Sequence, residues 1–170
     1  MSVGLLVARL VIGLAMAAHG AQKLFGWFGG YGFQGTAGFL AAKGYRPAPL
    51  FTFALAAGEL ASGALTALGL LGPLGPALMI LIMLVALVVG HWGNGFFATT
   101  NGIELPVLYA TAALALAVAG PGRLSLDRLL GLQGFWTPRV AWIAIAAAVV
   151  GAVLNLAVRR PEAPPAPRTT

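Results

Sequence analysis

The sequence predicts an all-α integral membrane protein, a four-helix transmembrane bundle with an additional C-terminal transmembrane helix. Its 170 residues are 59% hydrophobic and only 8% charged, and the mean hydropathy is +0.91. Ten basic and four acidic residues cannot coat a water-soluble protein of this size. The chain also carries five apolar runs that approach the ~20 residues needed for a helical span. These observations place the chain in a membrane.

The same composition excludes several functions. Cysteine is absent, so disulfides, thiol catalysis and cysteine-ligated metal centres are excluded. The net charge of +6 would suggest nucleic acid in a soluble protein. Here most of the basic residues lie in the connecting segments, where they favour contacts with anionic lipid and set topology. We therefore expect membrane lipids as partners and no nucleic acid.

Glycine, proline and arginine delimit the predicted spans. Gly72-Pro73 makes the second and third runs a helical hairpin, Gly120-Pro121-Gly122 ends the fourth, and Arg159-Arg160 ends the fifth. A cleavable signal peptide ending near Ala15-Met16-Ala17 is the alternative for the first run, but residues 1–8 are not a polar n-region. The predicted spans are residues 3–20, 50–71, 74–92, 103–118 and 140–158.

Three segments outside the predicted spans have compositions that predict a structure. Residues 22–49 interleave seven glycines with seven aromatic residues, which predicts an interfacial segment with a short helix over 36–43. Ser125 is expected to cap a short helix in which Asp127 occupies the first turn. Four prolines in residues 161–170 predict a disordered tail.

Ionisable residues within spans are costly and usually face a bundle interior. At 1.5 Å per residue, two histidines, one on the first and one on the third span, lie at the same depth, towards the end of the bundle opposite the N-terminus. A lysine one turn from the first histidine and two glutamates on other spans lie in the same half. We therefore predict a ligand pocket open to that end, although each residue alone is also typical of an anchor or a helix cap. The predicted ligand-binding residues are His19, Lys23, Glu59, His91 and Glu104.

Arg9 is the exception, because it lies deep in the other half of the first span. Its level differs from that of Glu59 by ~7 Å, within reach of an extended guanidinium. The sequence therefore predicts a structural ion pair between Arg9 and Glu59.

Six basic residues flank the end of the bundle opposite the N-terminus and three flank the other end. This difference predicts that the end with six basic residues faces the cytoplasm.

Short motifs give the chain a family resemblance. The motifs are Arg9, His19-Gly20 with Lys23, Glu59 with Gly63, and Gly120-Pro121-Gly122-Arg123 leading into Ser125-Leu126-Asp127. In this order the chain resembles the DoxX family of small bacterial and archaeal membrane proteins over about residues 3–131. The resemblance implies a four-helix membrane domain over 1–131 and a multi-pass protein of the bacterial or archaeal inner membrane. Residues 132–160 would add one helix, and Leu124 stands where many members carry tyrosine.

The resemblance leaves function open, because relatives include the small subunit of thiosulfate:quinone oxidoreductase, accessory proteins of oxidative-stress complexes and many members without assigned activity. One hypothesis is an accessory subunit of a membrane redox system that holds a quinone-like ligand beside a redox partner subunit. The alternative is a non-enzymatic lipid-binding or scaffolding subunit. Haem ligation by the two histidines is a narrower idea, a transporter is disfavoured by the absence of broken helices, and no metal site is predicted.

Overall fold

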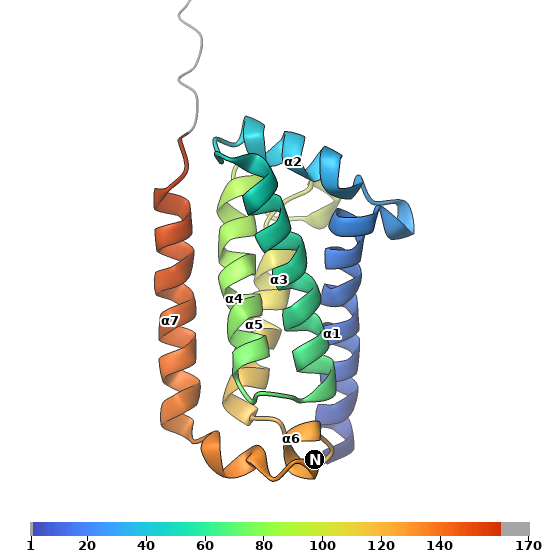
Figure 1. Cartoon of the computed structure of the whole chain (residues 1–170), viewed down its shortest axis with the longest axis vertical. Helices are drawn as coiled ribbons and strands as arrows, with labels where there is room; N and C mark the ends of the chain where they lie inside the picture. The colour runs from blue at the N-terminus through green and yellow to red at the C-terminus, as the bar shows by residue number, and fades with distance from the viewer. Residues whose placement is uncertain (1, 161–170) are drawn as a thin grey trace, which may run out of the picture.

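The computed structural model describes residues 2–160 as a bundle of roughly parallel and antiparallel helices (Figure 1). Four helices in this range are long and apolar enough to cross a membrane, and α5 is apolar but shorter. The helix α4 continues into a π-helical turn, η2. The long helices are α1 (Ser2–Phe25), α3 (Ala48–Leu68), α4 (Leu74–Ala86) with η2 (Leu87–His91), α5 (Glu104–Ala119) and α7 (Pro138–Ala157).

Short elements close the two ends of the bundle. The helix α2 (Gly32–Ala42) lies across the end opposite the N-terminus, after η1 (Trp27–Gly29), while η3 (Ala98–Thr100) precedes α5. At the N-terminal end lie α6 (Leu126–Leu129) and η4 (Leu132–Phe135) (Figure 1). The short helix predicted over 36–43 is found as part of α2, which begins four residues earlier. The predicted tail over 161–170 lies outside the described residues.

Local sequence signals explain most helix boundaries. Gly26 (φ 74°) and Gly69 (φ 63°) adopt left-handed backbone conformations directly after α1 and α3, where a residue without Cβ is favoured. For this reason α3 ends at Leu68 rather than at the predicted residue 71. Pro138 occupies the first turn of α7, and the Thr137 hydroxyl caps that helix by accepting from the Val140 amide at 3.4 Å.

The helix α4 is the centre of the bundle, since it packs against α3, α5 and α7. It is also the most apolar of the spans. Three of its residues, Met79, Ile82 and Met83, are buried together with Met16 of α1 and Ala113 of α5. A helix that is apolar all round is expected at a position with neighbours on every side.

Glycines bring α1 and α3 into backbone contact. A Cβ added to Gly13 would lie 2.6 Å from the Gly63 carbonyl oxygen and 2.6 Å from the Ala67 amide nitrogen. At Gly20 it would lie 2.6 Å from the Leu60 amide nitrogen. Small residues permit such close approach of helices in membranes, where lipid offers no hydrophobic driving force for association.

At the N-terminal end, two buried charged side chains satisfy backbone groups of the turns. The Arg9 guanidinium donates to the carbonyls of Pro121 and Leu124. The Asp127 carboxylate accepts from the amides of Leu71 at 2.9 Å and Gly72 at 2.6 Å. Ser125 caps α6 and Asp127 lies in the first turn of that helix, as predicted, while the Asp127 carboxylate binds the turn between α3 and α4. These bonds join α1, the α3–α4 turn and the α5–α6 connection.

At the end of the bundle opposite the N-terminus, a hydrogen bond between side chains joins α7 to the connection between α2 and α3. The hydroxyl of Tyr45, which is only 1% exposed, donates to Asn155 Oδ1 at 2.8 Å. Burial raises the pKa of the Tyr45 phenol, and the charge of Arg159 partly offsets this effect. Nearby, the Arg160 amide donates to the Gly44 carbonyl at 2.9 Å.

We expect Gly13→Ala to destabilise the bundle, because its methyl group would press on the α3 backbone, which cannot rotate away as a side chain can. Overpacking of this kind costs about 1–3 kcal/mol. The measurement is the thermal midpoint in mild detergent. The control is Gly38→Ala in α2, where a Cβ meets nothing within 4 Å and alanine favours the helix. Equal midpoints for the two variants would contradict the close contact.

We expect Tyr45→Phe to cost about 1 kcal/mol at neutral pH, because one buried hydrogen bond is lost. A phenol whose pKa is raised by folding contributes stability that is complete below the unfolded pKa of about 10 and is lost as pH rises through the higher folded value. The stability difference between wild type and Tyr45→Phe should therefore shrink at high pH. Tyr31→Phe, at a side chain 92% exposed on the same end, should show neither effect in the same melting series.

Candidate functional site

Two adjoining cavities lie between the ends of α1, α2, α4 and α5. The inner cavity, of about 210 Å³, is bounded largely by apolar side chains of α3, α4 and α5. The outer one, of about 710 Å³, lies beside η1 and the start of α2. The residues that line both cavities are His19, Lys23, Phe39, Gly90 and His91. A polar boundary with an apolar interior behind it is a common form of ligand site.

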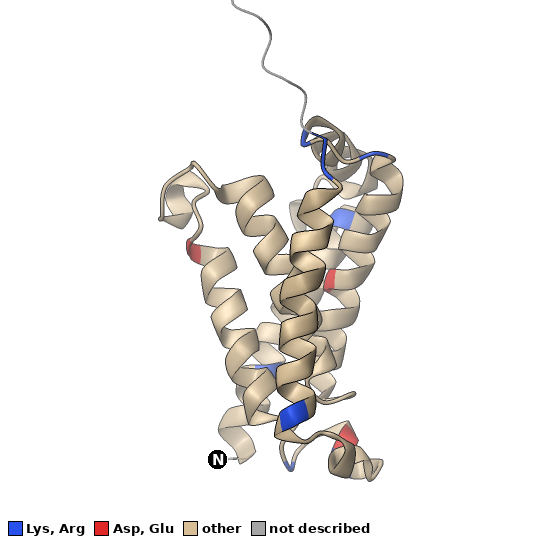
Figure 2. Ribbon diagram, turned by 90° about the vertical axis from the view of Figure 1, so that its left-hand side faces the viewer, with Lys and Arg blue, Asp and Glu red and all other residues tan. Residues whose placement is uncertain are grey.

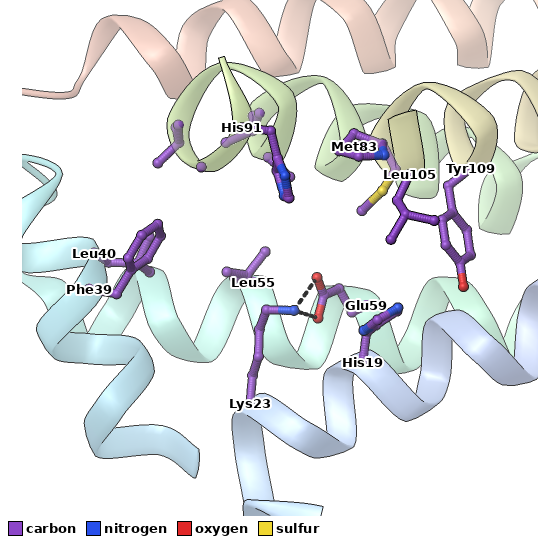
Figure 3. Close-up of a pocket in the computed structure, with 15 residues that line it drawn as sticks. His19, Lys23, Phe39, Leu40, Leu55, Glu59, Met83, His91, Leu105 and Tyr109 are labelled. Carbon is purple, nitrogen blue, oxygen red and sulfur yellow. Dashed lines mark hydrogen bonds and ion pairs between the residues drawn. The ribbon is translucent and has the colours of Figure 1, made fainter. Parts of the chain in front are cut away.

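An ion pair lies in the wall of the inner cavity (Figure 3). The Lys23 ammonium bonds both Glu59 carboxylate oxygens, at 2.8 and 2.7 Å. The Glu59 side chain is 3% exposed and that of Lys23 29%, so the pair connects the bundle interior with the cavity boundary. The α1–α3 backbone contact through Gly20 positions it, since Gly20 lies one turn before Lys23 and packs on α3 beside Glu59.

The predicted pairing of Arg9 with Glu59 is wrong. Glu59 is occupied by Lys23, and Arg9 instead binds the Pro121 and Leu124 carbonyls at the N-terminal end of the bundle. The comparison of depths located both residues along their helices but could not give the rotation of either helix. Rotation places Lys23, on a later turn of α1, opposite Glu59.

His19 lies beside Glu59 in the cavity wall (Figure 3). Gln22 Nε2 donates to the Phe28 carbonyl, so Gln22 Oε1 is left as the acceptor 3.1 Å from His19 Nδ1. Nδ1 of His19 therefore carries a proton, and Nε2 of the neutral ring is an acceptor. No partner for Nε2 occurs within residues 2–160. The ring also contacts Tyr109 edge-on, with centroids 5.8 Å apart.

His91 ends the π-helical turn and points into the cavity from the opposite wall (Figure 3). The turn is closed by the Trp92 amide, which donates to the Leu87 carbonyl at 2.7 Å. Its extra residue redirects the side chains that follow, and such turns are frequent at functional sites. His91 Nδ1 donates to the Asn101 carbonyl at 2.9 Å, so Nε2 is again an acceptor without a partner in the described chain.

Sequence reasoning missed most of the residues that line the cavities, and three of these bear directly on the site. The Tyr109 hydroxyl lies near His19 and Glu59 (Figure 3), and within residues 2–160 it has no hydrogen-bond partner. Phe39 of α2 lies at the boundary of the cavities, and Asn101 both lines the outer cavity and holds His91. Only Tyr109 carried a usable signal, as a polar aromatic residue one turn and a half into an apolar helix.

Glu104 does not line either cavity. Its carboxylate accepts from the Ala98 amide at 2.7 Å and so closes the loop before α5. The structure thus brings together four of the five predicted ligand residues and separates the fifth. Their role in ligand binding stays a prediction.

The arrangement can bind an uncharged polar group with both donors and acceptors. The two histidine Nε2 atoms accept, while the Tyr109 hydroxyl and the third Lys23 N–H can donate. In the described part of the chain no group of three or more histidine, aspartate or glutamate side chains gathers as a metal site would require.

Comparison with known proteins identifies one family. The DoxX family model matches residues 4–92, which is more than half of the 170-residue chain. The match covers α1 to the π-helical turn and contains Lys23, Glu59 and both histidines. No curated protein and no solved structure matches the chain.

We expect Lys23→Met to destabilise the protein more than Glu59→Gln, because Lys23→Met leaves a carboxylate unpaired in the interior whereas Glu59→Gln leaves an ammonium that can reach the cavity. Breaking a charged hydrogen bond costs about 1.5–3 kcal/mol. The double variant should recover part of the loss. A parallel cycle of Arg9→Met with Glu59→Gln should be additive. Coupling in the second cycle and none in the first would contradict the observed pairing.

Proposed function

Since the chain belongs to the DoxX family of membrane proteins, we propose that it is an accessory subunit of a membrane redox system that holds a quinone-like amphipathic ligand. The main support is that both histidines have Nδ1 committed to the protein and Nε2 without a partner at the boundary of the two cavities. Imidazoles anchored in this way are oriented before a ligand arrives, which reduces the entropy lost on binding.

The chemistry of these groups fits both redox forms of such a ligand. A quinone presents carbonyl oxygens, which can accept from the Lys23 ammonium or the Tyr109 hydroxyl. A quinol presents hydroxyl groups, which can donate to Nε2 of His19 or His91. The ring would lie at the boundary and the apolar tail would lie against Leu55, Met83 and Leu105. A cysteine-ligated redox centre would have to belong to a partner subunit, because this chain has no cysteine.

The ion pair between Lys23 and Glu59 has a positioning role in the proposal. Both Glu59 oxygens are bound by Lys23, so Glu59 is already satisfied and would not contact the ligand. It would instead hold Lys23 in the cavity wall and keep the local charge balanced. Ligand contacts are thereby assigned to His19, Lys23, His91 and Tyr109, with Glu59 as a positioning residue.

The test is binding of decyl-benzoquinone to the purified protein in mild detergent. Binding is measured by quenching of tryptophan fluorescence, since Trp27 and Trp92 lie within two residues in the chain of Gly29 and His91, which line the outer cavity. We expect His19→Ala and His91→Ala each to weaken binding about three- to tenfold, the effect of one hydrogen bond. The thermal midpoints should stay close to that of wild type, because neither side chain is in the packed core.

The matched control is Glu104→Gln, which changes a polar residue at the same end but outside both cavities and keeps an acceptor for the Ala98 amide. It should bind decyl-benzoquinone as wild type does. If the two histidine variants, still folded, also bind with wild-type affinity, the proposed site is wrong. If decane at equal concentration displaces decyl-benzoquinone and relieves the quenching, the cavity selects apolar chains rather than a quinone ring, and the lipid-binding alternative is favoured.

A further inference from the structure

A groove lies between α3 and α7, with α4 as its floor. It encloses about 210 Å³, and no charged residue of the described chain lines it. Figure 2, in which α7 faces the viewer, shows this helix without charge between its two ends, and the sequence carries none between Arg139 and Arg159. The groove therefore accepts apolar groups and disfavours charged ones.

The groove is closed at the end of the bundle opposite the N-terminus. There the Tyr45 and Phe51 rings are in contact, with centroids 4.9 Å apart, and the Tyr45 hydroxyl donates to Asn155 Oδ1. Further along the groove, Gly151 lets α7 approach α4, since a Cβ at this position would lie 2.7 Å from Leu81 Cδ1. A chain in the groove would therefore run along α4 past Leu81, towards the middle of the span.

A thin wall separates the groove from the inner cavity. Leu40, Leu55 and Val85 line both hollows. Leu40 is only 5% exposed, and valine is restricted to one main rotamer in a helix. Leu55 is half-buried and is not branched at Cβ, so its side chain is the part of the wall that can turn aside most easily.

The next turn of α3 limits this opening. Gly58 lies three residues after Leu55, and a Cβ added to it would lie 3.2 Å from Ile82 Cδ1 of α4. The two helices are thus in close contact at Gly58. A passage between α3 and α4 is therefore confined to the level of Leu55.

The inner cavity is small for an amphipathic ligand with a long tail. Its volume of about 210 Å³ is below the ~300–1,000 Å³ of common ligand sites. The outer cavity is larger, but polar side chains such as Gln22 and Asn101 line it. A tail that extends from a ring at the boundary of the two cavities needs further apolar space, and the groove behind Leu55 doubles the volume of the inner cavity.

We propose that the ligand is a long-chain amphiphile whose apolar tail passes Leu55 between α3 and α4 and lies in the groove beside α7, an inference that rests on the proposed function. Bilayer lipid is as apolar as the groove, so the groove adds little affinity of its own. It supplies the path by which the ring stays at the histidines while the tail reaches the bilayer. The helix α7, outside the family match over residues 4–92, forms one wall of this path.

The test compares ethyl-, decyl- and pentadecyl-benzoquinone on the full-length protein in mild detergent, by tryptophan quenching corrected for partition into micelles. Ala54 lines the groove, and Ala54→Phe would fill it without adding a tryptophan. We expect Ala54→Phe to bind ethyl-benzoquinone as wild type does and pentadecyl-benzoquinone about tenfold more weakly, because the long tail loses its path. The decyl compound should show an intermediate loss.

The matched control is Ala61→Phe, the same change at an exposed alanine of α3 that lines neither the inner cavity nor the groove. It should bind all three compounds as wild type does. If Ala54→Phe causes no loss, or an equal loss for the ethyl and pentadecyl compounds, the tail does not use the groove and the proposal is overturned. Absence of any loss would leave bilayer lipid as the occupant of the groove.

A second measurement on wild-type protein does not depend on the folding of a variant. A decyl-benzoquinone with a diazirine at the end of its chain is bound and irradiated, and mass spectrometry locates the label. We expect labelling of α3 around Ala54 and of α4 around Leu81. Labelling confined to residues of the outer cavity would contradict the path.

The ethyl compound separates this inference from the proposed function. If ethyl-benzoquinone does not bind wild type, or binds equally well to His19→Ala, the quinone site itself is wrong. If it binds through His19 while Ala54→Phe changes nothing for the pentadecyl compound, the quinone site stands and only the tail path is wrong.

Discussion

The close contact between α1 and α3 is the constraint on which the candidate site depends. Gly13, Gly20 and Gly63 let the two backbones touch, and at that separation Lys23 and Glu59 form an ion pair at 2.7 Å. A buried carboxylate in a membrane bundle is tolerated when a counter-charge satisfies it. The glycines therefore allow the approach of α1 and α3 at which Lys23 and Glu59 pair, and this ion pair makes the cavity wall polar.

The polar groups at the two ends of the bundle differ in whether the protein itself supplies their hydrogen-bond partners. At the N-terminal end, Arg9 and Asp127 bind backbone groups of the turns, which the hydrocarbon region cannot hydrate. At the other end, the histidine Nε2 atoms and the Tyr109 hydroxyl have no partner in the described chain, although nearby side chains orient them. Polar groups that are held in position and yet unpaired are those expected to meet a ligand. We therefore interpret the groups at the N-terminal end as structural and those at the opposite end as functional.

The part of the chain beyond the family match is not independent of the site. α5 begins after residue 92 and contributes Leu105, Pro106 and Tyr109 to the inner cavity. α7 packs on the far side of α4 and meets the rest of the bundle's polar network through Asn155 and Tyr45. The groove beside this contact shares Leu40, Leu55 and Val85 with the inner cavity. A ligand in the cavity would therefore lie across one thin wall from this groove.

The sequence by itself determined the membrane class, the family, the approximate spans and the depth of each polar residue, because hydropathy and helical rise depend only on local sequence. It could therefore predict that His19, Lys23, Glu59 and His91 lie in one half of the bundle. The tertiary structure alone decided which residues meet. The rotation of each helix about its axis depends on packing between helices. This rotation pairs Lys23 with Glu59 and directs Arg9 to the carbonyls of the turns. The π-helical turn before His91 and the separation of Glu104 from the cavities also arise from contacts between segments distant in sequence, which no local pattern encodes.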